Sequence, residues 1–597
     1  MTTWPTLPAF IAERLSQPRS IALAERVDGR TIALSAEDVH RRAAAVAFAL
    51  RARGVGAGDR VAIVSENQLD WLIADFGILY AGAVVVPMFA TVAEDQLAYI
   101  LKDAEAKLVF AGDAAAAQRV RDAVAAPPPI VVFGASGDDG MDAFVREGEP
   151  SFAARPAELA EFTAQVTLDD LAVLIYTSGT TGTPKGVMLS HRNVISNVYG
   201  AYNPAETGFS AGETALSVLP FAHIFEHTDS LGYLYNHVTQ YVTTPDRLLE
   251  DLRAVRPHYV ACVPRIFERV LAGIVGSALQ AGGVKAKLVP WAIEAGAAYE
   301  RDTRAGGANP LLQLANAVAQ ALVLKKIKPA LGLDRLHYFV SGSAPLHRDT
   351  ALALAAMGLP VCEGYGMTET SPVVTVNRPD DIKFGTVGTP IDGVQVRLAE
   401  DGEVLVKGPN VMLGYYHLPA TEQPFTADGW LQTGDIGTFD ADQHLVITDR
   451  KKELFKSSGG KWIAPARIET AIKRSIFIGQ VMAFGDDQPH PTVLVAPNWG
   501  LIRTELSLGS EVTTAQMAAD DRVRTLVIRE VEHQTADLAS FERVRRVGIL
   551  PRDLTVEDGE LSPTLKVRRR VVEQRYGPLI RQAYEEDLHA RKAALGV

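Results

Sequence analysis

The chain has 597 residues, of which 47% are hydrophobic, and a formal net charge of −12. This length exceeds the size at which one hydrophobic core usually keeps growing, so two or more domains are expected. The acidic balance argues against binding nucleic acid through its phosphates and favours a cytoplasmic enzyme.

Neither the cysteines nor the N-terminus indicates a secreted or membrane-spanning protein. Cys262 and Cys362 are the only cysteines, and their apolar settings predict small buried residues rather than nucleophiles. Residues 1–14 lack the basic region and apolar core of a secretory signal. Residues 76–93 are uncharged, but glycines and a proline interrupt them, which favours a helix end followed by a buried strand at 83–86.

The first 170 residues alternate between helical and strand-like patterns. Residues 37–53 predict an amphipathic helix, and residues 60–64, 107–111 and 130–133 predict strands. Such alternation is typical of βαβ units, so we expect parallel sheets with helices on their faces.

A loop rich in glycine and hydroxyl groups follows the apolar run at 171–175, which predicts a buried strand. Its sequence from 176 to 186 is Tyr-Thr-Ser-Gly-Thr-Thr-Gly-Thr-Pro-Lys-Gly. Glycines let the backbone approach a ligand, hydroxyls donate to phosphate oxygens, and Lys185 adds a positive charge. The spacing differs from a P-loop, because glycine rather than Ser or Thr follows the lysine. The loop therefore predicts a polyphosphate cradle, with a flexible surface loop as the alternative.

Two later loops carry groups that suit a nucleotide. Small residues at 341–345 follow a predicted strand at 336–340 and leave room for a flat base. In the segment 363–370, Tyr365 offers a stacking face, and Thr368 and Glu369 offer the oxygen ligands that Mg²⁺ prefers. Taken alone, Tyr365 is equally consistent with a core aromatic residue and Glu369 with a helix N-terminal charge.

From Gly388 onward, short strands and tight turns predict a small antiparallel β-subdomain with an Asp-Gly turn at 401–402. It leads to Asp435, whose carboxylate can accept hydrogen bonds from two ribose hydroxyls. The charged run at 449–456 is, by itself, most simply a solvated turn.

Together these motifs resemble the adenylate-forming superfamily, which includes acyl-CoA synthetases, luciferases and the adenylation domains of peptide synthetases. They occur in the family order from residue 176 to residue 566, and residues 219–226 and 263–268 are most similar to the long-chain fatty acyl-CoA synthetases. The resemblance implies an α/β fold. Residues 1–450 would form a large N-terminal domain of two α/β layers plus the β-subdomain, and residues 451–597 a small mobile α+β C-terminal domain.

The resemblance also implies the reaction and its partners. A long-chain fatty acid would be activated by ATP and Mg²⁺ to acyl-AMP with release of pyrophosphate, and then transferred to CoA. A homodimer and peripheral contact with a membrane stay open.

Site residues carry over from the family motifs position by position. The phosphate contacts would be Thr177, Ser178, Gly179, Thr180, Thr181 and Lys185. The adenine segments would supply Ser343, Ala344, Glu363, Gly364, Tyr365, Gly366 and Thr368, with Glu369 as metal ligand. Ribose would contact Asp435 and Arg450, Lys452 would be a hinge, and Gly459 and Gly460 would border the pantetheine arm of CoA. The catalytic residues would be Lys566, His223 and Thr181.

Several alternatives accompany these assignments. His223 also suits a core histidine, and Lys566 suits a basic surface strand, because Leu565 stands where the family usually has glycine. Residues 271–333 are mostly helical, and their role cannot be derived from spacing; within them, residues 305–324 predict a packed surface helix or, with the lysines that follow, a helix touching a membrane surface. The rival functions are a fatty acyl-AMP ligase that serves a carrier-protein thiol and a non-catalytic nucleotide-sensing module.

Overall fold

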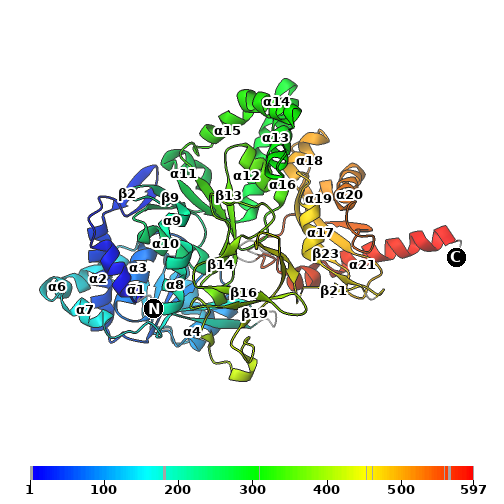
Figure 1. The fold of residues 1–597 in the computed structure, drawn as a ribbon. Coiled ribbons are helices and arrows are strands. Elements are labelled where there is room, and N and C mark those ends of the chain that lie inside the picture. The colour runs from blue at the N-terminus through cyan, green and yellow to red at the C-terminus, as the bar shows by residue number, and fades with distance from the viewer. Residues whose placement is uncertain are drawn as a thin grey trace.

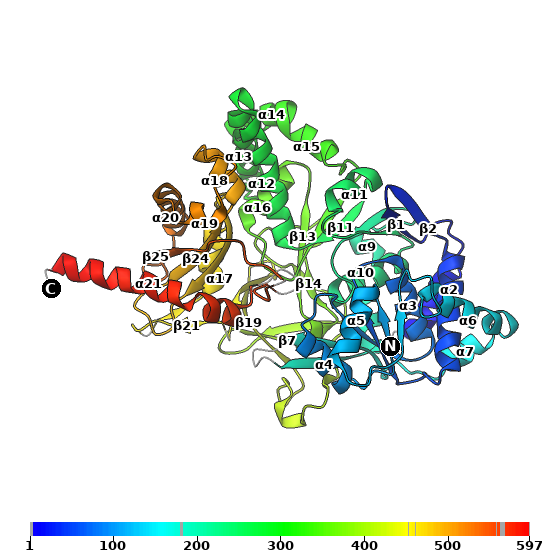
Figure 2. The same cartoon turned by 180° about the vertical axis from the view of Figure 1, so that it is seen from behind.

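The computed structural model describes residues 4–178, 183–307, 309–451, 453–459, 461–556, 558–561 and 567–595. Figures 1 and 2 show a large N-terminal domain, coloured blue to yellow-green, and a small C-terminal domain, coloured yellow to red. This mixed α/β architecture confirms the predicted fold class.

Within the described residues, seven strands form one sheet of the large domain in the order β18-β8-β7-β4-β3-β5-β6. Their bounds are β3 Arg60–Val64, β4 Val84–Met88, β5 Leu108–Ala111, β6 Ile130–Val132, β7 Leu171–Ser178, β8 Pro184–Ser190 and β18 Gly414–Tyr415. Strands β3 to β7 run parallel, as the βαβ pattern predicts. Every residue of β4 is buried, because this strand lies between β3 and β7 and helices cover the sheet.

A second sheet of nine described strands has the order β15-β14-β13-β12-β11-β9-β10-β1-β2. Its strands are β1 Leu23–Val27, β2 Arg30–Leu34, β9 Thr214–Ser217, β10 Thr239–Val242, β11 Tyr259–Cys262, β12 Tyr338–Ser341, β13 Val361–Gly366, β14 Val373–Val376 and β15 Thr389–Pro390. The six strands from β1 to β13 in this order are parallel, so their carboxyl ends share one edge.

The β-subdomain is an antiparallel sheet of β16 Gln395–Leu398, β17 Glu403–Lys407, β19 Leu431–Phe439 and β20 Leu445–Arg450. The predicted turn at 401–402 joins β16 to β17. The C-terminal domain contains the hairpin β21 Phe455–Lys456 and β22 Trp462–Ile463, and a sheet of β23 Ile478–Phe484, β24 Thr492–Pro497 and β25 Arg546–Ile549.

Helices cover both large sheets. Those of residues 7–255 are α1 Leu7–Leu15, α2 Ala36–Ala52, α3 Leu69–Tyr80, α4 Glu94–Asp103, α5 Ala114–Ala123, α6 Met141–Ala154, α7 Glu158–Thr163, α8 His191–Ala201, α9 Pro204–Thr207, α10 Ile224–Tyr235 and α11 Leu248–Val255. Helix α2, the amphipathic helix predicted at 37–53, begins at a capping box in which Ser35 and Asp38 exchange hydrogen bonds. Its inner face packs into the largest apolar cluster with α3.

Further α-helices and one π-helical stretch of the large domain lie between residues 264 and 356. They are α12 Pro264–Ala281, α13 Gly283–Arg304, α14 Pro310–Ala319, a π-helical stretch at Gln320–Leu324, α15 Lys325–Ala330 and α16 Arg348–Ala356. The C-terminal domain has α17 Pro465–Ile472, α18 Trp499–Glu505, α19 Thr514–Ala518, α20 Asp521–Thr535 and α21 Arg569–Leu595. Among the described helices, none combines the length and apolar character needed to cross a membrane.

Two strand predictions need correction. The strand expected at 171–175 continues to Ser178, so Thr177 belongs to the strand rather than to a loop beyond it. This extension follows from antiparallel pairing with β8, in which Thr177 lies opposite Lys185. The strand expected at 336–340 begins at Tyr338 and ends at Ser341, where it pairs with β11 and β13.

Candidate active site

A cavity of about 1490 Å³ lies between the two domains. The predicted site residues that line it are Thr177, Lys185, His223, Ser343, Gly364, Tyr365, Gly366, Thr368, Glu369, Asp435 and Arg450. The C-terminal domain contributes residues 482–486 and 567–571 to the same wall. The cavity borders the carboxyl ends of β12 and β13, where ligands of parallel sheets usually bind.

Three side chains form a bonded group on the side of the cavity where we expect a ribose to bind, namely Tyr365, Asp435 and Arg450. Asp435 is buried on β19, and the Tyr365 hydroxyl donates to its Oδ2 at 2.7 Å. Arg450, its cross-strand partner on β20, places Nε 3.1 Å from Asp435 Oδ1. Burial, reinforced by the nearby Asp435 charge, raises the pKa of Tyr365 well above its usual value, so the hydroxyl keeps its proton and donates. The sequence placed these three residues up to 85 positions apart, between 365 and 450, and the structure brings them into contact.

Glu369 and Lys185 both contact the side chain of Tyr415. The Tyr415 hydroxyl on β18 donates to Glu369 Oε1 at 2.7 Å. The Lys185 ammonium lies 4.9 Å from the centroid of the Tyr415 ring. Tyr415 was not predicted from the sequence, because no motif marks it. A carboxylate has further lone pairs beyond the one that this hydroxyl uses, so Glu369 suits a hard cation.

Glu363 bonds to the backbone directly after the proposed adenine loop at 341–345. Its Oε1 accepts the Leu346 N–H at 2.8 Å, and burial raises the pKa of the carboxyl to about 8. Glu363 and the exposed Ala344 are not among the residues that line the cavity. Gly342 is required by close packing, because an added Cβ would come within 2.9 Å of the Phe225 ring.

His223 caps the N-terminus of α10 beside the cavity. Its Nδ1 accepts the Phe225 N–H at 3.2 Å, which places the imidazole ring where the helix dipole favours a negative group. Farther along α10, Asp229 is buried, lines the cavity and accepts a hydrogen bond from the Tyr202 hydroxyl. Burial raises the pKa of Asp229 to about 7. Sequence reasoning missed Asp229, although ionisable residues at 226, 227 and 229 within an apolar helix are an available signal.

The other predicted residues divide into two groups. Gly179, Thr180, Thr181, Lys452, Gly460 and Lys566 lie outside the described residues. Ser178 ends β7. Gly459 lies in an exposed turn and is not among the residues that line the cavity. Both cysteines are buried, as predicted, and burial raises the pKa of the Cys362 thiol to about 12.

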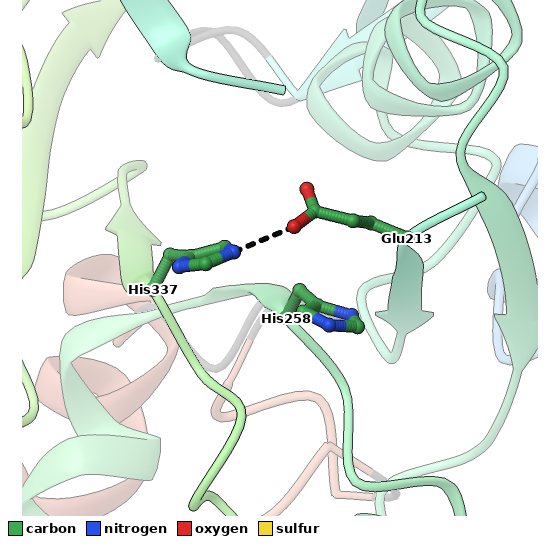
Figure 3. A group of neighbouring side chains, drawn as sticks. All are labelled: Glu213, His258 and His337. Atoms are coloured by element: carbon green, nitrogen blue, oxygen red, sulfur yellow. Dashed lines mark hydrogen bonds and ion pairs between the residues drawn. The ribbon is translucent and has the colours of Figure 1, made fainter. Parts of the chain in front are cut away.

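Another group of titratable side chains lies at the opposite edge of the nine-stranded sheet (Figure 3). Glu213, His258 and His337 each directly precede a strand, namely β9, β11 and β12. His337 Nε2 lies 2.7 Å from a Glu213 oxygen, and the Thr214 N–H donates to His258 Nδ1 at 3.0 Å. The Arg335 guanidinium lies 3.0 Å from His258 Nε2, so both nitrogens of the His258 ring already have a protein partner. A metal ion at His258 Nε2 would have to displace the positively charged guanidinium. We interpret this group as an ion-pair network rather than a metal site.

Comparisons with known proteins agree with this geometry. The sequence matches the family described as AMP-binding enzyme over residues 12–416 and the AMP-binding enzyme C-terminal domain over residues 453–588. It is 35% identical to the long-chain-fatty-acid–CoA ligase FadD15 of Mycobacterium bovis, covering 94% of each chain. It is 30% identical to the peroxisomal long chain acyl-CoA synthetase 7 of Arabidopsis thaliana, covering 91% of this chain and 80% of the relative.

Among solved structures, the adenylation domain of a carboxylate reductase from Mycobacterium chelonae superposes with a TM-score of 0.76 at 22% identity, covering 98% of this chain and 92% of that one. At this identity, the likeness establishes the fold alone. The family matches span most of the described cavity wall and both domains. The chain therefore belongs to the AMP-binding enzyme family.

Proposed function

We propose that this protein is a long-chain fatty acid–CoA ligase that forms AMP. The observation that carries this proposal is the shared cavity, in which phosphate, ribose and metal candidates from the large domain face residues 567–571 of the C-terminal domain. The names of relatives at 30–35% identity over most of the chain support the fatty acid as substrate and CoA as acceptor.

In the first half-reaction, a carboxylate oxygen of the fatty acid forms a bond to the α-phosphorus of ATP. The bond to the bridging oxygen breaks, and pyrophosphate leaves. Lys185 and the Thr177 hydroxyl hold phosphate oxygens, and Lys566 stabilises the charge that develops at the α-phosphate. The ribose hydroxyls donate to Asp435, while Tyr365 and Arg450 keep that carboxylate oriented. His223, at the start of α10, positions the substrate carboxylate.

The metal site belongs to the same proposal. Glu369 would hold Mg²⁺, since its carboxylate is buried, lines the cavity and contacts Tyr415, the residue whose ring lies beside Lys185. When bound, the ion would neutralise phosphate charge and orient the leaving pyrophosphate. Thr368 offers a further oxygen nearby.

In the second half-reaction, the CoA thiolate attacks the acyl carbon, and AMP leaves with the bonding electron pair. We assign residues 1–450 to the domain that binds AMP and the acyl group, and residues 451–597 to a mobile domain that rotates at Lys452. The rotation exchanges Lys566 for a surface near Gly459 and Gly460, along which the pantetheine arm approaches.

The decisive experiment measures pyrophosphate release and acyl-CoA formation with purified protein across fatty acids of increasing length. Each buried methylene contributes about 0.8 kcal/mol, so a tunnel for long chains should rank substrates steeply by length. Preference for long acids together with CoA-ester formation supports the proposal. Flat or absent activity on all of them contradicts it.

Two rivals give different products. An acyl-AMP ligase would release pyrophosphate but form no free CoA ester, and a nucleotide-sensing module would bind ATP without releasing pyrophosphate. Cytoplasmic location stays a prediction of this proposal, which fractionation would test, and a homodimer stays open until the elution mass is measured.

A further inference from the structure

We propose that the helical segment 310–330 is a docking surface for the face of an anionic lipid bilayer. This inference is independent of the proposed enzymatic function, because it rests on the exposed side chains and charge of one projecting element. The surface consists of Leu311, Leu314, Val318, Leu322, Lys325 and Lys326.

The apolar part of this surface is exposed although similar side chains are normally buried. Leu311 is 76% exposed, Leu314 64%, Val318 40% and Leu322 49%. Their spacing of three, four and four residues places them on one side of a continuous helical run through α14 and the π-helical stretch. A contiguous row of exposed leucines is a common sign of an interaction site.

The opposite side of the same run is firmly attached to the protein. Ala319 and Leu324 are fully buried, and the Gln320 side chain donates to Ala356 O of α16 at 2.7 Å. Gly296 of α13 makes room for Leu324, because a Cβ there would lie 2.8 Å from its side chain. The exposed row is therefore the outer face of a helix that packs on the protein through its other side, as the prediction of a packed surface helix requires.

Charge identifies the partner. Residues 305–330 contain no Asp or Glu and three lysines, whereas the whole chain has a net charge of −12. Lys325 and Lys326 are exposed at the end of the apolar row. Helix α13, which packs along α14, carries Lys285 and Lys287 near its start and Glu294, Glu300 and Asp302 farther along. Leucines flanked by lysines match the acyl boundary and the anionic headgroups of a bilayer surface.

The shape of the molecule permits this contact. Figures 1 and 2, seen from opposite sides, both place α14 at an outer end of the molecule, away from both termini. A second copy of the chain fits less well, because a two-fold contact would place this surface against itself and offer the lysines no acidic partner.

Flotation with lipid vesicles tests the inference on the full-length protein. Wild-type protein should float with vesicles of phosphatidylcholine and phosphatidylglycerol, and far less with phosphatidylcholine alone or in high salt. Leu311→Ser/Leu314→Ser and Lys325→Glu/Lys326→Glu should each lower the bound fraction by about tenfold or more.

Matched controls remove equivalent groups elsewhere. Val27→Ser/Ile32→Ser deletes two exposed apolar side chains of the β1–β2 hairpin, and Lys102→Glu/Arg121→Glu makes the same change in charge on α4 and α5. Both should bind vesicles as the wild type does. The inference is wrong if the wild type does not float, or if the controls lose binding as strongly as the test variants. A dimeric elution mass that Leu311→Ser/Leu314→Ser abolishes, without vesicle binding, would assign the surface to a second copy instead.

Discussion

Polar side chains of similar kinds lie at the amino and carboxyl edges of the nine-stranded sheet, but those at one edge contact other protein groups and those at the other face a cavity. At the amino edge, His337 bonds to Glu213 (Figure 3), and His258 accepts the Thr214 N–H. At the carboxyl edge, side chains that follow β12 and β13 line a large cavity. Strands β11 and β12 reach both edges, so the difference does not arise from the type of strand.

The difference lies in what satisfies each polar group. Around Glu213, protein partners supply the hydrogen bonds, and the group adds only local stability. Around Glu369 and Asp435, protein partners orient the carboxylates but leave them facing the cavity, where a ligand can complete their bonding. Changes at the cavity should therefore alter reaction rates, whereas changes at the amino edge should alter stability alone.

The largest effect is expected for the two lysines. Lys566→Ala should slow acyl-AMP formation by about 1,000-fold or more, because it removes positive charge at the α-phosphate, while sparing thioester formation from supplied acyl-AMP. Lys452→Pro, which fixes φ, should do the reverse. The rates of acyl-AMP formation and of thioester formation from supplied acyl-AMP are measured in separate assays. Equal loss of both half-reactions in both folded variants would show that the two-conformation proposal is wrong.

Glu369→Gln should lower the rate of adenylation by about 100-fold, since a neutral amide is a poor ligand for Mg²⁺. Pyrophosphate release measured against Mg²⁺ concentration should show a raised metal requirement. Tyr415→Phe is the matched variant, because it removes the hydroxyl that donates to Glu369 while keeping the ring beside Lys185; its loss should be smaller. An unchanged Mg²⁺ dependence in Glu369→Gln would refute the assignment.

His223→Ala should reduce the rate by about 30-fold for short and long acids alike, because the ring is proposed to position the carboxylate common to all of them. The readout is kcat/KM across chain lengths, with thermal unfolding to check that α10 keeps its cap. Normal rates on every acid would leave His223 with a packing role only.

Glu363→Gln should change the pH dependence of stability. Burial raises the pKa of Glu363 to about 8, so the folded protein retains a proton that the unfolded chain loses above its ordinary pKa near 4.5. The wild type therefore loses stability as pH rises from about 4.5 toward 8, and the amide does not. At pH 8 the variant's free energy of unfolding should exceed that of the wild type by about 4 kcal/mol, and at pH 5 by under about 1 kcal/mol. A difference that does not vary with pH would contradict this.

Much of the fold was predictable, because alternating helical and strand patterns dictate parallel sheets. Strand β3 was predicted at its observed bounds, and α2 within one residue at each end. Many site residues were also predictable, since contiguous motifs carry them. Tyr415, Asp229 and the Glu213 network were missed, because their partners lie far away in sequence and only tertiary packing joins them. For residues 305–324 the sequence left open a packed surface helix or a helix touching a membrane, since periodicity identifies an apolar stripe without showing what covers it.

The smallest effect is expected at the amino edge. Burial favours the neutral form of Glu213, but hydrogen bonds from Tyr259 and His337 outweigh it, so its pKa is lowered below the ordinary value near 4.5. An acid with a lowered pKa in the folded state contributes stability that is present above about pH 4.5 and is lost as pH falls through the lowered value. Because His337 is half-exposed, solvent screens the contact, and Glu213→Gln should cost about 0.5 kcal/mol at pH 7 and less near pH 4. Rates of pyrophosphate release should stay unchanged in this variant. A fall in rate with no change in thermal stability would show that the amino edge, like the carboxyl edge, takes part in the reaction.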